Sequence, residues 1–161
     1  MSAKIIPIQQ LQQRYSGSYQ FTVTHLPELD YRKYLARQLR GAIIPTDEAI
    51  PPEAVALDIS LDDIEGDVVA GLSAWTHHDN LIIDMLWVGE PLRGQGLGRR
   101  LLQMAEEVAI QRACCRCRVR VTHHMAYFVG AGYRITGTVQ ALDTKGNSAP
   151  SYAVYWLEKM L

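Results

Sequence analysis

Residues 81–100 read LIIDMLWVGEPLRGQGLGRR, and this stretch decides the fold. Residues 81–88 are apolar except for one aspartate, which is typical of a central β-strand buried on both faces. The glycine-rich segment 93–98 follows it, and from Leu97 onward apolar residues recur at steps of three and four. That spacing predicts an amphipathic helix whose opposite, solvent-facing side carries Arg99, Arg100, Gln103, Glu106 and Glu107. The stretch therefore places a glycine loop between a buried strand and a helix N-terminus.

The glycine loop has the chemistry of an anion site. Glycines let the backbone turn tightly, and the N–H groups at a helix N-terminus attract a phosphate or pyrophosphate. A Walker P-loop is excluded because the Lys–Ser/Thr pair is missing, and a dinucleotide fingerprint is excluded because neither Gly94 nor Gly96 has a glycine five residues on. The remaining pattern is Arg-x-x-Gly-x-Gly, formed by Arg93, Gly96 and Gly98.

The rest of the chain predicts a mixed α/β (α+β) order, β-α-βββ-α-β-α-ββ. Besides the strand and helix described above, strands are expected at 19–25, 54–60, 68–77, 116–122, 133–142 and 152–157, and helices at about 28–40 and 123–131. Short polar turns between the middle strands favour antiparallel pairing. The segments 1–17 and 41–52 and the turn at 145–147 have no clear periodicity.

Composition excludes several classes of protein. The chain has 161 residues, 16 Lys+Arg and 17 Asp+Glu, a net charge of −1, and 48% hydrophobic residues. This balance argues against disorder and against bulk nucleic-acid binding. No apolar run approaches the roughly 18 residues of a membrane span, and the N-terminus does not resemble a signal peptide, so we expect a cytoplasmic protein.

The three cysteines, Cys114, Cys115 and Cys117, form one tight cluster. An odd number in one cluster cannot build a disulfide framework, and the spacing to His123 and His124 matches no standard zinc pattern. We therefore expect reduced thiols at a helix-to-strand junction and no metal.

The loop signature resembles that of the GCN5-related N-acetyltransferases (GNAT family), in particular a bacterial subgroup of small-molecule acetyltransferases. The resemblance extends from about residue 54 to residue 161: the stretch AYFVGAGY at 126–133 resembles the family's A-x-x-FY-x-x-x-GF/GY segment, and 152–161 resembles its closing strand. It implies a single N-acetyltransferase domain over residues 1–161. The implied fold is a central mixed, mostly antiparallel sheet of about six or seven strands flanked by helices.

The resemblance also implies acetyl-CoA as the cosubstrate. Backbone groups of Leu86, Trp87 and Val88 would pair with the pantetheine arm, as an added strand would. The pyrophosphate would lie on N–H groups of the loop and helix start, which are Gly94, Gln95, Gly96, Leu97, Gly98 and Arg99. Arg93, together with Arg99 or Arg100, would add positive charge.

The implied reaction is direct attack of an amine on the thioester in a ternary complex. In this family a tyrosine commonly protonates the leaving thiolate, but the matching position is Phe128, which is instead expected to be an apolar wall beside the coenzyme. Tyr127 is one place off and is the candidate acid.

Several candidates for the general base remain open: Asp84, Glu90, and one of the pair His123 and His124. Asp84 is the only charged residue in its strand, and strict alternation would put it on one face with Ile82, Leu86 and Val88. His124 begins the segment near the expected acetyl group, and its ordinary pKa suits proton transfer.

The predicted function is acetylation of a primary amine of a small molecule, with no nucleic-acid or membrane partner. Two alternatives stay open: a catalytically weak acetyl-CoA-binding module that regulates a partner protein, and a protein acetyltransferase. The identity of the amine is not predicted, and a homodimer is left open.

Overall fold

The computed structural model describes residues 19–25, 29–39, 50–122, 124–140 and 153–161. The predictions for 1–17, for most of the loop 41–52 and for the turn at 145–147 lie outside these ranges. The strands are β1 (Gln20–Thr24), β2 (Val55–Asp62), β3 (Val68–His77), β4 (Asn80–Val88), β5 (Arg116–Val121), β6 (Arg134–Gln140) and β7 (Ala153–Met160). The helices are α2 (Leu29–Gln38), the short 3-10 helix η1 (Glu90–Leu92), α3 (Leu97–Gln111) and α4 (Met125–Gly130).

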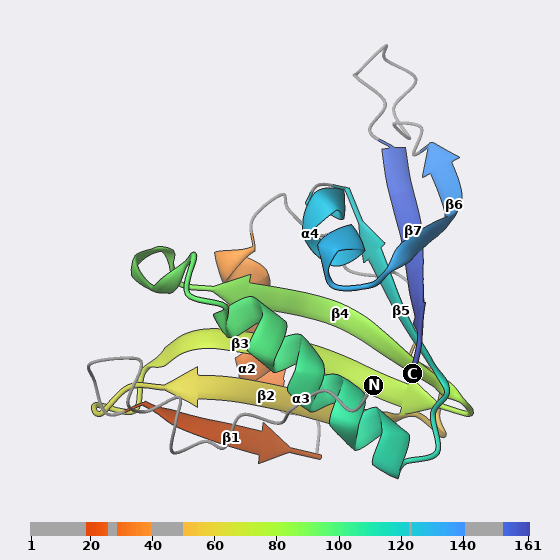
Figure 1. Ribbon diagram of the computed structural model, residues 1–161. Helices are drawn as coiled ribbons and strands as arrows, with labels where there is room; N and C mark the ends of the chain where they lie inside the picture. Colours follow the sequence, from red (N-terminus) through yellow and green to blue (C-terminus); the bar gives the residue numbers. More distant parts are fainter. Residues whose placement is uncertain (1–18, 26–28, 40–49, 123, 141–152) are drawn as a thin grey trace, which may run out of the picture.

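All seven strands form one sheet in the order β1-β2-β3-β4-β5-β7-β6. Neighbouring strands are antiparallel except for β4 and β5, which are parallel because α3 carries the chain back between them. Figure 1 shows α3 lying across one face of the sheet and α2 behind the other. The predicted element order and the mostly antiparallel sheet are confirmed, and no described helix is long and apolar enough to cross a membrane.

The parallel pair β4–β5 separates partway along its length. Pairing covers only the start of each strand, from Asn80 with Arg116 to Ile83 with Val119. Beyond this point β4 continues to Val88, and Figure 1 shows it diverging from β5 toward the side where α4 lies. One edge of the second half of β4 is therefore not covered by β5.

A β-bulge in β4 lies at the point of separation. The register with β3 changes from Ala74–Ile83 to Ser73–Met85, so Asp84 is the extra residue of β4. The bulge corrects the prediction from strict alternation. Leu86 and Val88 share the face of Ile83, because they oppose Leu72 and Ala70, whereas Ile82 lies on the other face.

The core lies between α3 and the sheet. Leu97, Leu101, Ala105 and Ala109 of α3 are at most 2% exposed and belong to one apolar cluster with inward residues of β2, β3, β4 and β5. Each fully buried leucine of this kind contributes roughly 1.5–3 kcal/mol relative to an exposed one. The helix stripe predicted from the sequence is therefore the buried one.

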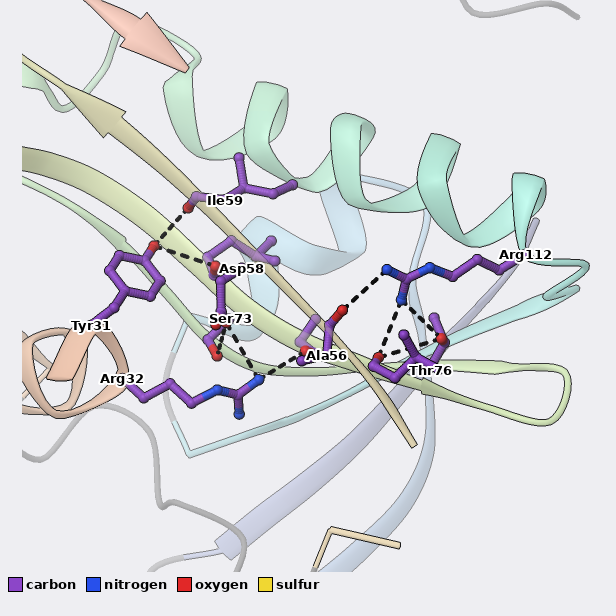
Figure 2. A network of polar contacts seen from close by, with 11 residues as sticks. Tyr31, Arg32, Ala56, Asp58, Ile59, Ser73, Thr76 and Arg112 are labelled. Carbon is purple, nitrogen blue, oxygen red and sulfur yellow. Dashed lines mark hydrogen bonds and ion pairs between the residues drawn. The ribbon is translucent and has the colours of Figure 1, made fainter. Parts of the chain in front are cut away.

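The end of α3 is fixed by its backbone. Ala113 has φ +63°, its N–H bonds the carbonyl of Ile110, and the N–H of Cys114 bonds the carbonyl of Ala109. This is a Schellman motif with alanine where glycine is usual. Arg112 then donates to the carbonyls of Val55 and Ala56 and to the hydroxyl of Thr76, which ties the helix end to β2 and β3 (Figure 2).

Helix α2 docks on the opposite face through polar side chains. The hydroxyl of Tyr31 donates to the carbonyl of Ile59 at 2.6 Å, and Arg32 donates to the carbonyl of Ala74 and pairs with buried Asp58 (Figure 2). Gly71 of β3 leaves room for the Tyr31 hydroxyl, which a Cβ at this position would strike. These contacts bring the C-terminal end of α2 to the separated half of β4.

Candidate functional site

A cavity of about 630 Å³ opens where β4 leaves β5. Its walls come from the end of β4, the glycine loop, the first turn of α3, and α4. The predicted binding residues on this wall are Leu86, Trp87, Val88, Arg93, Gly94, Gly96, Leu97, Gly98, Arg99 and Phe128, whereas Gln95 is not on it. The structure thus brings together nearly all the residues predicted to hold the coenzyme.

The glycine loop presents its backbone to the cavity. Gly94 and Gly96 have φ of +76° and +83°, and a Cβ on either would meet nothing within 4 Å. Both positions therefore require glycine for backbone conformation rather than for space. The loop then enters α3 with Gly96 as its N-cap, and no side chain caps the helix.

The first turn of α3 has free hydrogen-bond donors. The first helical bond runs from the N–H of Arg100 to the carbonyl of Gly96, so the N–H groups of Leu97, Gly98 and Arg99 precede it and have no partner inside the helix. All three residues line the cavity. Together with the helix dipole, they make this end of the cavity an anion site.

Two arginines lie beside the anion site, and each donates a hydrogen bond to a backbone carbonyl. Arg93 Nε donates to the carbonyl of Val88 at 2.9 Å, and an Arg99 terminal nitrogen donates to the carbonyl of Gly130 at 3.0 Å. Arg100 is only 7% exposed, lies 3.8 Å from Glu107, and is not on the cavity wall. Of the two alternatives predicted for added charge, Arg99 is therefore the one at the cavity.

The backbone of Trp87 faces β3 rather than the cavity. The N–H of Gly89 donates to the carbonyl of Val69, and hydrogen-bonded pairs alternate along an antiparallel ladder. The next hydrogen-bonded pair is therefore Trp87 with Gly71. The predicted pairing of β4 backbone with the pantetheine arm is therefore narrowed to Leu86 and Val88. Trp87 lines the cavity and its indole packs edge-on against Tyr34 of α2, but its backbone groups are directed to β3.

The backbone groups of Leu86 and Val88 point the other way, toward the gap left by β5. The bond from Arg93 to the Val88 carbonyl fits this direction and occupies that acceptor. The N–H and carbonyl of Leu86 and the N–H of Val88 remain directed into the gap. They form a short strand edge that an extended ligand can join.

Helix α4 supplies an aromatic wall. Phe128 is 4% exposed and packs edge-to-face against Tyr133, with 5.5 Å between ring centroids. Tyr127 is 37% exposed, and its hydroxyl lies over Gly98, where a Cβ would be 2.6 Å from it. Burial raises the pKa of Tyr127 and the charge of Arg99 lowers it.

Two of the base candidates differ in position. His124 is exposed, lines the cavity and precedes α4 with φ +64°. Asp84 is half-buried at the bulge, two residues before Leu86, and is not on the cavity wall.

Some wall residues were not predicted to bind. Val121 ends β5 and alternates inward with Cys117 and Val119, a signal that strand periodicity could have supplied. Leu92 directly precedes Arg93, so the loop motif could have indicated it. Gln38 and Leu39 at the end of α2 have no local signature, because only the packing of α2 on the sheet brings them there.

A buried polar cluster lies beneath α4. The hydroxyl of Tyr133 donates to Glu106 Oε1 at 2.9 Å and contacts Cys117 Sγ, while Lys159 pairs with Glu106 Oε2 at 2.8 Å. Sequence periodicity puts Arg100 and Glu106 on the solvent face of α3, and this is wrong: they are 7% and 9% exposed.

The cysteines have separate environments. Cys114 and Cys117 are buried and Cys115 is exposed, all as free thiols. Burial raises the pKa of Cys117 to about 12. Among the described residues no group of three or more His, Cys, Asp or Glu side chains could hold a metal ion.

The comparisons with known proteins identify the family. The model of the acetyltransferase (GNAT) family matches residues 9–130, which is more than half of the chain. The fold, a mostly antiparallel sheet of seven described strands flanked by helices, is the one that the resemblance implied for that family. The chain therefore belongs to the GNAT family of acetyltransferases.

Individual relatives agree with this assignment. The chain is 30% identical over 103 residues to the acetyltransferase Atu2258 of Agrobacterium fabrum, covering 64% of this chain and 72% of the relative. An acetyltransferase structure from Agrobacterium tumefaciens is 24% identical, has a TM-score of 0.59, and covers 88% of this chain and 99% of its own. The IAA acetyltransferase of Bacillus cereus is 18% identical, with a TM-score of 0.62 and coverages of 88% and 100%. These structures share the fold.

Proposed function

We propose that this protein transfers the acetyl group of acetyl-CoA to a primary amine of a small molecule, by direct attack in a ternary complex. The observation that carries the proposal is that the free N–H groups of α3 and the uncovered edge of β4 face one cavity. A pyrophosphate fits the first and an extended pantetheine arm fits the second. The cavity volume of about 630 Å³ is that of a ligand site.

The arm runs from the glycine loop toward the bulge of β4. Its amide groups pair with the backbone of Leu86, and its thioester lies toward the point where β4 and β5 part. Of the two N–H groups directed into the gap, that of Leu86 is nearer the bulge and can polarise the thioester oxygen, as the donors of an oxyanion hole do. The apolar ring of Phe128 forms the facing wall.

The reaction needs one proton removed from the amine. The neutral amine nitrogen attacks the carbonyl carbon, the C–S bond breaks, and the thiolate leaves. The excess proton on nitrogen passes to a base, directly or through water. We propose Asp84 for this role, acting through water, because the bulge puts this residue where the two strands part and it is not itself on the cavity wall. His124 is the alternative base.

A second candidate function has its own observation. Phe128 occupies the position of the family's usual acid, and its ring is buried against Tyr133. A side chain without a proton to donate fits a module that binds acetyl-CoA and regulates a partner. Thiolate is a tolerable leaving group, however, so an enzyme without this acid remains the first proposal.

Binding and turnover separate these functions. Calorimetry with acetyl-CoA measures binding, and thiol release with a panel of primary amines measures transfer. We expect saturable binding and sequential kinetics in coenzyme and amine, with no thiol released when the amine is left out. Binding without thiol release on any amine supports the regulatory module, and ping-pong kinetics contradict direct attack. If acetyl-CoA does not bind at all, both proposals are wrong.

A further inference from the structure

Tyr127 lies at the phosphate end of the cavity, and this position gives it a different role from the one its family resemblance predicts. We propose that the Tyr127 hydroxyl is a hydrogen-bond donor to the coenzyme's pyrophosphate, and that it does not protonate the leaving thiolate. The inference rests on the proposed binding of acetyl-CoA.

The first support is the position of the hydroxyl. It lies over Gly98, the second residue of α3, where a Cβ would be 2.6 Å from the hydroxyl oxygen and 3.4 Å from the ring carbon that bears it. The free N–H groups of Leu97, Gly98 and Arg99 belong to this same turn. A group bound by those N–H donors is therefore within reach of the hydroxyl.

The second support is the reason for the third glycine. Gly94 and Gly96 have positive φ and open space around them, but Gly98 is a helical residue whose missing Cβ leaves room for the Tyr127 hydroxyl. Gly94 and Gly96 are therefore required by the backbone conformation of the loop, whereas Gly98 is required because a larger residue would clash with Tyr127 of α4. Tyr127 and Gly98 act as a matched pair.

The third support is charge. Burial raises the pKa of Tyr127 more strongly than the nearby Arg99 lowers it, so the hydroxyl keeps its proton at neutral pH. The Arg99 guanidinium donates to the Gly130 carbonyl at the same end of the cavity. A neutral O–H donor and a fixed cation beside free N–H groups suit a doubly charged pyrophosphate.

Position also argues against the acid role. The pantetheine arm separates the pyrophosphate from the sulfur, so one hydroxyl held over the α3 N-terminus does not reach both. Phe128, the residue in register with the family's acid, has no proton to give. The leaving thiolate therefore departs without receiving a proton from Tyr127 or Phe128.

The test compares the whole coenzyme with ligands that contain only its pantetheine end or only its nucleotide end. Tyr127→Phe removes the hydroxyl and keeps the ring that packs on Phe128. We expect the KM for acetyl-CoA to rise about tenfold, since the lost bond is to a charged group. We expect kcat/KM for S-acetylpantetheine, which has no pyrophosphate, to stay within twofold of the wild type.

A binding measurement makes the test independent of turnover. The nucleotide half of coenzyme A, 3′-phospho-ADP, has the pyrophosphate but no sulfur. Its dissociation constant should rise about tenfold in Tyr127→Phe. Thr22→Val is the control: it removes a hydroxyl of β1 that is bound to Asp62, at the sheet edge away from the cavity, and should leave this constant unchanged.

A second variant tests the pair. Gly98→Ala should raise the dissociation constant of 3′-phospho-ADP by a similar factor, because the added Cβ displaces the Tyr127 hydroxyl. In the Tyr127→Phe background the same change should add less than twofold, since the clashing oxygen is gone.

Two results would overturn the inference. One is an unchanged affinity of Tyr127→Phe for 3′-phospho-ADP. The other is a fall in kcat that is equal for acetyl-CoA and S-acetylpantetheine, which would identify Tyr127 as the acid. Failure of the wild type to bind acetyl-CoA would instead overturn the proposed function itself.

Discussion

Gly96 and Gly66 have nearly the same backbone conformation, with φ of +83° and +87°, and a Cβ on either meets nothing within 4 Å. Only Gly96 lies at the cavity, whereas Gly66 is in the turn between β2 and β3. Alanine at either position should cost about 1–2 kcal/mol of stability, because L-residues are strained at positive φ. Comparing the same substitution at these two positions therefore separates the effect of backbone strain from the effect on ligand binding.

The residue-scale prediction is that Gly96→Ala lowers the affinity for acetyl-CoA at least tenfold and that Gly66→Ala leaves it unchanged. The physical reason is that strain at Gly96 moves the N–H groups that would meet the pyrophosphate. Calorimetry with acetyl-CoA measures the affinities, and thermal unfolding checks that the stability losses match. Equal affinities in the two variants would contradict a backbone-built anion site.

Asp84 carries a second residue-scale prediction. Asp84→Asn keeps the size of the side chain and removes the proposed base, so we expect kcat to fall about 100-fold. Because Asp84 is not on the cavity wall, the dissociation constant of acetyl-CoA should not change. Both quantities are measured on the same preparation. An unchanged kcat would remove Asp84 from the chemistry and leave His124, tested as His124→Gln, as the predicted base.

At the scale of elements, α3 joins the binding loop to the buried cluster beneath α4. Glu106 of α3 accepts from Tyr133, which precedes β6, and pairs with Lys159 of β7. Tyr133 in turn packs against Phe128 of α4. The cluster therefore fixes α4 against α3, and with it the ring that faces the glycine loop.

The Cys117 thiol in this cluster gives a pH dependence. Its pKa is raised from the ordinary value near 9 to about 12, chiefly by burial. Between these values the unfolded chain has lost the proton and the folded chain has kept it, so the free energy of unfolding must fall as pH rises. The slope for this one group approaches about 1.4 kcal/mol per pH unit.

Urea unfolding at a series of pH values from 9 upward measures this slope. In Cys117→Ala we expect it to be shallower by the contribution of one proton, whatever the change in absolute stability. The same thiol should resist alkylation at pH 8 in the folded protein, whereas exposed Cys115 should react. A variant slope equal to that of the wild type would contradict the raised pKa.

Sequence periodicity predicts these elements well and their irregularities poorly. The strand 81–88 and the helix after it are confirmed, because a run of apolar residues and a stripe at helical spacing are local signals. The bulge at Asp84 is missed, because an extra residue becomes visible only in the register with β3. Burial of Arg100 and Glu106 is missed for a related reason: partners such as Tyr133 and Lys159 come from distant segments.

The same limit applies to the candidate site. The glycine loop and α4 residues could be predicted from their motif, and they line the cavity. Gln38 and Leu39 could not, since the end of α2 reaches the cavity through the packing of the whole helix on the sheet, to which Tyr31, Arg32 and buried Leu35 contribute.

At the scale of the whole molecule, the cavity exists because β4 and β5 pair over only part of their length. The separation leaves a strand edge beside a helix N-terminus. Anion binding therefore needs no basic excess, and a chain with a net charge of −1 can hold a pyrophosphate.

A crystal structure of the protein with coenzyme A bound shows whether the helix N-terminus and the strand edge hold one ligand. We predict the pyrophosphate within hydrogen-bond distance of the N–H groups of residues 94–99, and the pantetheine arm in the gap between β4 and β5 beside Leu86. A pyrophosphate bound anywhere else, or an arm outside the gap, would contradict this binding site.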